Sequence, residues 1–240
     1  VRAPQAPATP RPNIRQGDDF STHAAAATTT LMVSTGESRM PNMTRLLKDI
    51  KACSICAQHL PFSPKPLLQA STSARLLIAG QAPGLRAHQS GVLFDDSSGE
   101  RLRQWLGLSH EEFYDRRLVA ILPMGFCYPG KGRSGDSPPR PECAPAWRRT
   151  LLESMPQIEL TIIIGRHAQQ FHAPNDSANL TDAVRCWKMW WPSLIVLPHP
   201  SPRNNGWLKQ NPWFARDVIP EIRKRVRKFL DDSRRPDIKN

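Results

Sequence analysis

The stretch "LLIAGQAPG", residues 76–84, is an apolar run that stops abruptly at a loop of glycine, glutamine and proline. A second stretch, "LIVLPHPSPRN" at residues 194–204, has the same order of an apolar run followed by a proline-rich polar loop. A continuous apolar run, as opposed to an alternating one, is typical of a strand buried on both faces of a parallel sheet. Because ligands of such sheets bind beyond the carboxyl ends of the strands, both loops are expected to line one crevice.

Two further apolar runs complete the predicted sheet. Helical spacing of apolar residues between the runs predicts helices at 99–106 and 144–155. Alternating strands and helices favour an α/β fold, so we expect three α/β/α layers around a four-stranded, mostly parallel twisted sheet. The strands are expected at residues 76–79, 118–122, 161–164 and 194–197.

The two ends of the chain depart from this alternation. Residues 1–40 are rich in proline, alanine and threonine and show no apolar periodicity, so this segment is expected to be disordered. The folded domain is expected over residues 41–232, from a helix capped by Asn42 to a helix at 219–229 with one apolar and one basic face. Residues 233–240 are expected to form a flexible basic tail.

The charge of the chain points to a class of partner. Lysine and arginine number 33 against 21 acidic residues, which gives a formal net charge of +12. This excess favours nucleic acid first and an acidic membrane surface second, with a basic surface that serves only solubility as the plain alternative. Because the sequence contains neither an apolar run of about 18 residues nor an apolar leader, we expect a cytoplasmic protein without a membrane span.

Four of the five cysteines have a spacing that suggests metal binding. "CSIC" places Cys53 and Cys56 in a Cys-x-x-Cys pair, and Cys127 and Cys143 follow 16 residues apart. Four thiolates can hold either a four-iron cluster or a tetrahedral zinc ion, and four buried unligated cysteines are the third interpretation. Cys186 has no partner in this pattern and is expected to be a core residue.

Three segments resemble the signature motifs of the uracil-DNA glycosylase superfamily: "GQAPG" at 80–84, "GVLFDDSSGERLRQWLG" at 91–107 and "HPSPRN" at 199–204. The resemblance covers roughly residues 43–230 and is greatest to the thermophile-type branch, which carries an iron–sulfur cluster. It implies a monomeric hydrolase of base excision repair that cleaves the N-glycosidic bond of uracil, or of a related deaminated base, flipped out of DNA. The resemblance also implies that a [4Fe–4S] cluster is held by Cys53, Cys56, Cys127 and Cys143.

The resemblance further assigns roles to residues around the expected crevice. Phe94 would stack on the flipped base, although a phenylalanine packed in the core is the alternative. The backbone N–H groups around Gln81 and Ala82 would donate hydrogen bonds to the departing uracil anion, and Gly80 would lie against the base. His199 would be a further donor to this anion, unless it is a loop histidine hydrogen-bonded to backbone. DNA contacts are expected from Ser201, Arg203, Asn204, Lys131 and Arg133.

Two departures from the family pattern leave the function open. Ala82 stands where efficient members have an aspartate that positions water, and Gln81 stands where the iron–sulfur branch often has glutamate. Asp95 or Asp96 is a candidate replacement, with Asp96 as the tentative catalytic residue, unless the two acids only cap the helix that follows. The asparagine that reads uracil is also missing from "ILPMGFC". The alternatives are a catalytically weak or inactive lesion-binding protein, or an enzyme that acts on another N-glycoside.

Overall fold

The computed structural model describes residues 42–133, 135–173 and 179–234. The segment 1–40, for which disorder is expected, and residues 235–240 of the expected tail lie outside the described residues. In the described part of the chain, no helix combines the length and the apolar character that a membrane crossing requires.

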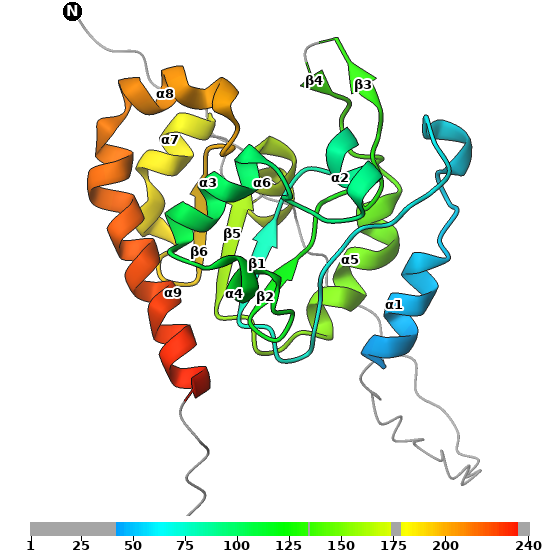
Figure 1. The fold of residues 1–240 in the computed structure, drawn as a ribbon, viewed down its shortest axis with the longest axis horizontal. Coiled ribbons are helices and arrows are strands. Elements are labelled where there is room, and N and C mark those ends of the chain that lie inside the picture. The colour runs from blue at the N-terminus through cyan, green and yellow to red at the C-terminus, as the bar shows by residue number, and fades with distance from the viewer. Residues whose placement is uncertain (1–41, 134, 174–178, 235–240) are drawn as a thin grey trace, which may run out of the picture. The chain divides into compact units, whose positions relative to one another are not determined.

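A four-stranded parallel sheet forms the centre of the fold (Figure 1). Its strands are β1 (Leu76–Ala79), β2 (Val119–Ile121), β5 (Leu160–Ile164) and β6 (Leu194–Leu197). They lie in the order β2-β1-β5-β6, so that Leu77 of β1 is opposite Ala120 of β2 and Thr161 of β5. The predicted α/β class with a parallel central sheet is confirmed, and each strand lies within one residue of its predicted range at either end.

Helices cover both faces of the sheet, because successive side chains of a buried strand point to opposite sides. Leu76 and Ile78 of β1 belong to one apolar cluster, and Leu77 belongs to another. The second cluster includes side chains of α1 (Met43–Lys51) and α5 (Cys143–Glu153). The first includes side chains of α3 (Ser97–Leu106), α4 (His110–Tyr114), α6 (Arg166–His172), α7 (Leu180–Arg185) and α9 (Ile219–Arg234). The three expected layers are therefore present.

The carboxyl ends of the parallel strands open at one edge of the sheet, and short segments follow them. After β1 comes α2 (Leu85–Ser90), and after β2 comes an antiparallel hairpin of β3 (Lys131–Gly132) and β4 (Gly135–Asp136). The hairpin is not among the predicted elements. The remaining short elements are η1 (Ala57–His59), η2 (Trp187–Met189), η3 (Pro202–Asn204), α8 (Asn205–Gln210) and the π-helical turn η4 (Phe214–Val218).

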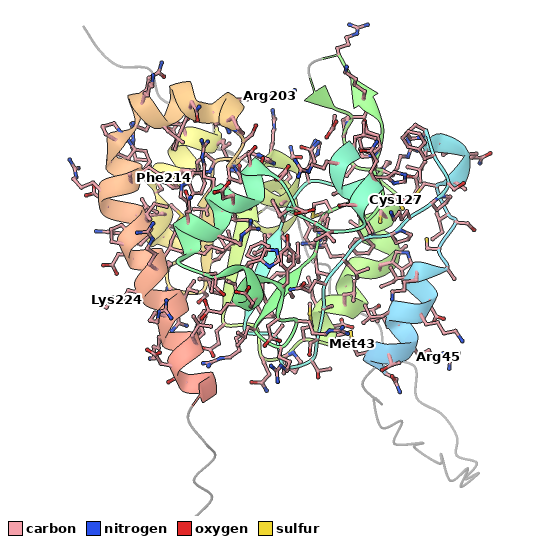
Figure 2. All side chains as sticks on the ribbon, viewed as in Figure 1. Met43, Arg45, Cys127, Arg203, Phe214 and Lys224 are labelled. Carbon is pink, nitrogen blue, oxygen red and sulfur yellow. The ribbon has the colours of Figure 1, made fainter. Side chains whose placement is uncertain are left out.

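The first and last helices follow their predicted patterns with one difference. The side chain of Asn42 accepts hydrogen bonds from the N–H groups of Thr44 and Arg45, which is the predicted cap of α1. α9 reaches Arg234, whereas the domain is expected to end at residue 232. Lys224 is exposed on its outer face (Figure 2). The inner face buries Ile222, Val226 and Phe229, as their spacing predicts.

Candidate functional site

A pocket of about 640 Å³ lies at the carboxyl ends of the strands. It is lined by the loop after β1, the segment around Phe94, Pro123 after β2, the β3–β4 hairpin and the loop after β6. The two proline loops therefore share one crevice, as their positions after two strands predict. The residues with a predicted role toward the base all lie in this lining: Gly80, Gln81, Ala82, Phe94, Asp96 and His199. We call this space the base pocket.

The first signature loop is held by the segment that follows β2. The carbonyl of Gly80 accepts a hydrogen bond from the Met124 N–H at 2.9 Å, and the carbonyl of Gln81 accepts one from the Gly125 N–H at 3.0 Å. The Gln81 amide nitrogen Nε2 donates to the carbonyl of Ser137 at 3.3 Å. Among the described residues, no hydrogen-bond acceptor is found for the backbone N–H of Gln81 or Ala82. Two unpaired donors are therefore available in the wall of the base pocket.

Phe94 both lines the base pocket and packs on the core, so the two predicted interpretations overlap. Its ring meets the edge of Phe113 with centroids 6.1 Å apart. Its backbone has φ of 57°, a left-handed conformation that costs free energy for a bulky residue and is often found at functional sites. Gly99 permits this turn, because a Cβ at Gly99 would lie 1.7 Å from the Phe94 carbonyl oxygen.

His199 is exposed to solvent but lies within the concave base pocket. The Ser201 N–H donates to Nδ1 of His199 at 3.1 Å, so the neutral ring carries its proton on Nε2. Partial loss of hydration lowers the pKa of His199, and the carboxylates of Asp96 and Asp136 oppose this shift only in part. The imidazole is therefore neutral at pH 7 and has one N–H donor available.

The second signature loop is fixed by its own side chains and by α3. Asn204 Nδ2 donates to the carbonyl of His199 at 2.8 Å, and Arg101 Nη1 donates to the carbonyl of Ser201 at 3.1 Å. Arg203 is exposed and extends toward the hairpin, since Nη1 lies 3.1 Å from the position that a Cβ would take at Gly135. Arg203 is labelled in Figure 2. Ser201, Arg203 and Asn204 all line the base pocket.

Among the described residues, the lining of the base pocket contains three carboxylates, which differ in their hydrogen bonds and in their positions. Asp96 Oδ1 accepts the Gly99 N–H at 2.9 Å, so the helix-cap interpretation of Asp96 is confirmed. Asp95 is exposed at the pocket wall. Asp136, at the end of the hairpin, is a third carboxylate in the lining that sequence reasoning missed. The glycine-rich stretch "GKGRSGD" before it is the signal that could have indicated a tight hairpin.

Other predicted residues have mixed outcomes. Lys131 and Arg133 are exposed on the hairpin, outside the base pocket lining. Pro123 lines the base pocket while Met124 is buried in the core, so the end of β2 offers no side-chain amide. Cys186 is exposed, and the expectation that it is a core residue is wrong, because α7 ends there and a 3-10 turn follows.

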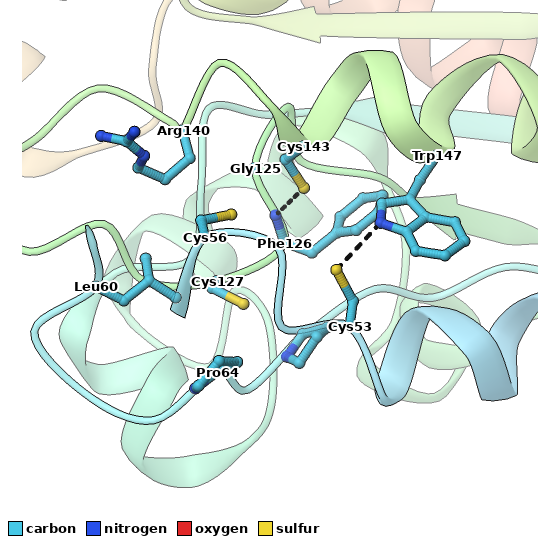
Figure 3. A pocket seen from close by; sticks show the side chains of 11 residues that line it. Cys53, Cys56, Leu60, Pro64, Gly125, Phe126, Cys127, Arg140, Cys143 and Trp147 are labelled. Carbon is cyan, nitrogen blue, oxygen red and sulfur yellow. Dashed lines mark hydrogen bonds between the residues drawn. The ribbon is translucent and has the colours of Figure 1, made fainter. Parts of the chain in front are cut away.

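The four cysteines predicted to bind metal line a second, small pocket with mostly apolar walls (Figure 3). We call this space the cysteine pocket. Trp147 Nε1–H donates to Sγ of Cys53 at 3.3 Å, and the Phe126 backbone N–H donates to Sγ of Cys143 at 3.4 Å. Hydrogen bonds to cysteine sulfurs recur in iron–sulfur sites, where they tune the cluster. Cys53 and Cys56 follow α1, Cys127 follows β2, and Cys143 begins α5.

The chemistry of these thiols depends on their burial. Burial raises the pKa of Cys127 to about 11, that of Cys143 to about 12, and that of Cys56 in the same direction. Such thiols become thiolates only when a metal displaces their protons. No group of three His, Cys, Asp or Glu side chains in the described ranges converges on a position for one metal ion. In a [4Fe–4S] site each thiolate binds a separate iron, so the four sulfurs of such a site need not converge on one position.

Arg148 is a fully buried guanidinium on α5. Its Nη1 donates to the carbonyls of Leu122 and Pro123, each at 3.1 Å, and its Nε donates to Nε2 of His172 at 3.2 Å. Burial and the nearby guanidinium lower the pKa of His172 to about 3. No ion pair joins Arg148 to a carboxylate in the described part of the chain. Arg148 thereby connects the end of β2, where Pro123 lines the base pocket, to the helix that carries Cys143.

A comparison with protein-family models agrees with the signature loops. The family model described as the uracil DNA glycosylase superfamily matches residues 68–223. A solution NMR structure of a "putative Uracil DNA glycosylase" from Methanosarcina acetivorans is similar at 15% sequence identity and a TM-score of 0.42, over 68% of this chain and 95% of that chain. The family match includes both proline loops, the Phe94 segment and the hairpin, and extends over more than half of the sequence. The chain belongs to the uracil DNA glycosylase superfamily.

Proposed function

We propose that this protein hydrolyses the N-glycosidic bond of uracil, or of a related deaminated base, flipped out of DNA. The observation that carries the proposal is the arrangement of the two signature loops in one pocket. One loop presents unpaired backbone N–H groups at Gln81 and Ala82, and the other presents the neutral imidazole of His199. Glycosidic cleavage leaves negative charge on the departing base, and fixed donors that face this charge lower the barrier.

The base would enter the pocket beside Phe94. An enzyme that acts on a base takes it out of the helical stack and reads it between aromatic or apolar side chains. The strained backbone of Phe94 holds its ring at the pocket wall, and Phe113 supports it from the core side. A Cβ at Gly80 would lie 3.8 Å from Cζ of Phe94, at van der Waals contact, so the absence of a side chain at Gly80 leaves space beside this ring for the base.

His199 would act as the principal donor to the departing base. Its Nδ1 is occupied by the Ser201 N–H, so only Nε2 carries a proton. A neutral imidazole can stabilise the uracil anion without protonating it, and the lowered pKa of His199 keeps the ring in this form at neutral pH. The donors Asn204 and Arg101 fix the loop backbone around it, which keeps the imidazole in place before the reaction begins.

DNA would be held by basic side chains at the rim of the pocket. Arg203 is exposed beside the hairpin, which carries the exposed side chains of Lys131 and Arg133. Phosphate contacts of this kind position the duplex and contribute most of the salt-dependent affinity. Ser201 and Asn204 would support the strand next to the flipped nucleotide. The formal net charge of +12 agrees with a polyanionic substrate.

The cysteine pocket would hold a [4Fe–4S] cluster, with zinc as the alternative. Four thiols from three separate segments and two N–H donors to sulfur support this proposal. When bound, the cluster supplies a covalent cross-link between the segment after α1, the segment after β2 and the start of α5. The residues themselves have a structural role, since they fix the loop whose Met124 and Gly125 N–H groups hold the first signature loop.

A second candidate function follows from what the pocket lacks. Position 82 offers no carboxylate and the end of β2 offers no side-chain amide. Both absences favour a protein that binds a flipped base without cleaving its glycosidic bond. The two functions are separated by incubating the protein with single- and double-stranded oligonucleotides that carry one uracil, followed by alkali. The enzyme is expected to produce a cleaved strand from uracil but not from the matched thymine oligonucleotide. Selective binding of uracil DNA without cleavage would favour the lesion-binding protein.

A further inference from the structure

We propose that Asp136, on the β3–β4 hairpin, is the carboxylate that orients and deprotonates the attacking water. This inference rests on the proposed function and names a residue outside the two signature loops. Asp136 lines the base pocket, and its charge acts on His199 across it. Its Oδ2 lies 3.4 Å from the position that a Cβ would take at Gly84, which places the carboxylate beside the first signature loop.

The hairpin is held in this place by both signature loops. Gln81 Nε2 donates to the carbonyl of Ser137, the residue that follows Asp136. The Arg203 guanidinium lies against Gly135, the residue that precedes it. The Ser137 N–H also donates to the carbonyl of Gly130 at 2.8 Å, and this hydrogen bond joins the two strands at the end of the hairpin opposite its turn. The side chain of Gln81 is therefore used to position the hairpin, and the carboxylate missing from the first loop is supplied by the element that this side chain holds.

The other two carboxylates of the pocket are less suited to this task. Asp96 Oδ1 is engaged by the Gly99 N–H as the cap of α3. Asp95 and Asp136 are both exposed in the pocket lining, but of these two only Asp136 lies beside Gly84 and carries a charge that acts on His199. In the described part of the chain, no hydrogen bond or ion pair engages the carboxylate of Asp136. Its lone pairs are thus available to accept from water, as a general base requires.

The chemical step balances with water as the only co-reactant. The water oxygen forms a bond to C1′ of the deoxyribose, and the bond from C1′ to N1 of the base breaks. The bonding electron pair leaves with the base as an anion that the His199 Nε2–H stabilises, while the water proton passes to Asp136. Release of that proton to the base or to solvent regenerates the carboxylate, and the products are free base and an abasic sugar.

The test compares Asp136→Asn and Asp136→Ala with wild type in single-turnover excision from a uracil duplex. Asp231→Asn, a substitution at an exposed position on α9, is the matched control for the loss of one negative charge. We expect the two Asp136 variants to lose on the order of 10²–10⁴-fold in rate, and the control to retain the wild-type rate. Binding to a duplex with a non-cleavable 2′-fluoro-deoxyuridine should be retained, because removing a negative charge beside DNA does not weaken phosphate contacts.

Formate rescue distinguishes a chemical role from a structural one. Added formate should restore part of the rate of Asp136→Ala, because a small carboxylate can take the vacated place beside the water, and it should not accelerate the wild type. An Asp136→Asn variant that cuts at the wild-type rate would overturn the proposal, as would equal losses in rate and in binding without rescue. A wild-type protein that releases no uracil would instead overturn the proposed function on which the assignment rests.

Discussion

The cysteine pocket and the base pocket are built in opposite ways. The cysteine pocket is small and apolar, and its four thiols belong to segments anchored by the ends of α1, β2 and α5. The base pocket is open and polar, and it is assembled from the segments that follow all four strands of the central sheet, with a hairpin on one side. Under the proposed function, the first region stabilises the fold through a bound cluster, whereas the second carries the chemistry. Substitutions in the cysteine pocket should therefore change the metal content and the melting temperature, whereas substitutions in the base pocket should change the excision rate.

The largest effect is expected in the cysteine pocket. Cys143→Ser removes a proposed cluster ligand at the start of α5 and leaves a polar hydroxyl in an apolar space. Purified Cys143→Ser should contain little iron and lose the absorbance of the cluster, and its melting temperature should fall by roughly 10 °C, which corresponds to about 3–4 kcal/mol for a domain of this size. Cys186→Ser, at the exposed cysteine, should keep both properties. Metal-free wild type with the same melting temperature would contradict the proposed cross-link.

The next largest effect is expected between the two pockets. Arg148→Ala leaves the buried carbonyls of Leu122 and Pro123 without their donor and opens a cavity. The free energy of unfolding should fall by about 2–3 kcal/mol. Arg149→Ala is the matched control, because this neighbouring side chain is 89% exposed and pairs with Glu153 on the surface, where such pairs contribute at most about 1 kcal/mol. Equal midpoints in urea unfolding for the two variants would contradict the role of Arg148.

A smaller effect, confined to function, is expected in the base pocket. Phe94→Ala removes the stacking surface and should lower the excision rate by an amount equivalent to about 1–3 kcal/mol. Affinity for undamaged DNA should stay nearly unchanged, because no base occupies the pocket in that complex. Phe62→Ala, at an exposed phenylalanine outside the base pocket, should excise at the wild-type rate. Equal losses on damaged and undamaged DNA would place Phe94 on the general DNA surface.

The smallest effect concerns the pH dependence of stability. The pKa of His172 is about 3 in the folded protein and 6.5 as an ordinary histidine, so the unfolded chain binds more protons between these pH values. The free energy of unfolding should therefore fall as the pH is lowered from 6.5. His172→Gln keeps an acceptor for Arg148 but cannot titrate, and it should lose about 0.7 kcal/mol less than wild type between pH 7 and pH 6. Parallel melting curves for the two proteins across this range would contradict the shift.

The sequence predicts the two regions unequally, for physical reasons. Apolar runs define the strands because a strand buried on both faces tolerates few polar residues, and cysteine spacing identifies the second pocket because thiols are rare and paired. The roles expected of Phe94 and His199 come from the resemblance of the segments that contain them to the family motifs. The role of Asp136 is not predicted, because the glycine-rich stretch before it indicates a hairpin but not the hydrogen bond from the distant Gln81 that places this hairpin at the pocket. The burial of Arg148 is not predicted either, because an arginine in a helix usually lies on the solvated face.

The central claim is that the neutral imidazole of His199 stabilises the departing base. The direct test is single-turnover excision from a uracil duplex by wild type, His199→Asn and His199→Ala, with circular dichroism to establish that each variant is folded. Loss of one such donor should lower the rate on the order of 10²–10³-fold for His199→Ala and less for His199→Asn, which retains an N–H, while affinity for DNA stays nearly unchanged. A folded His199→Ala variant that cuts as fast as the wild type would contradict the account.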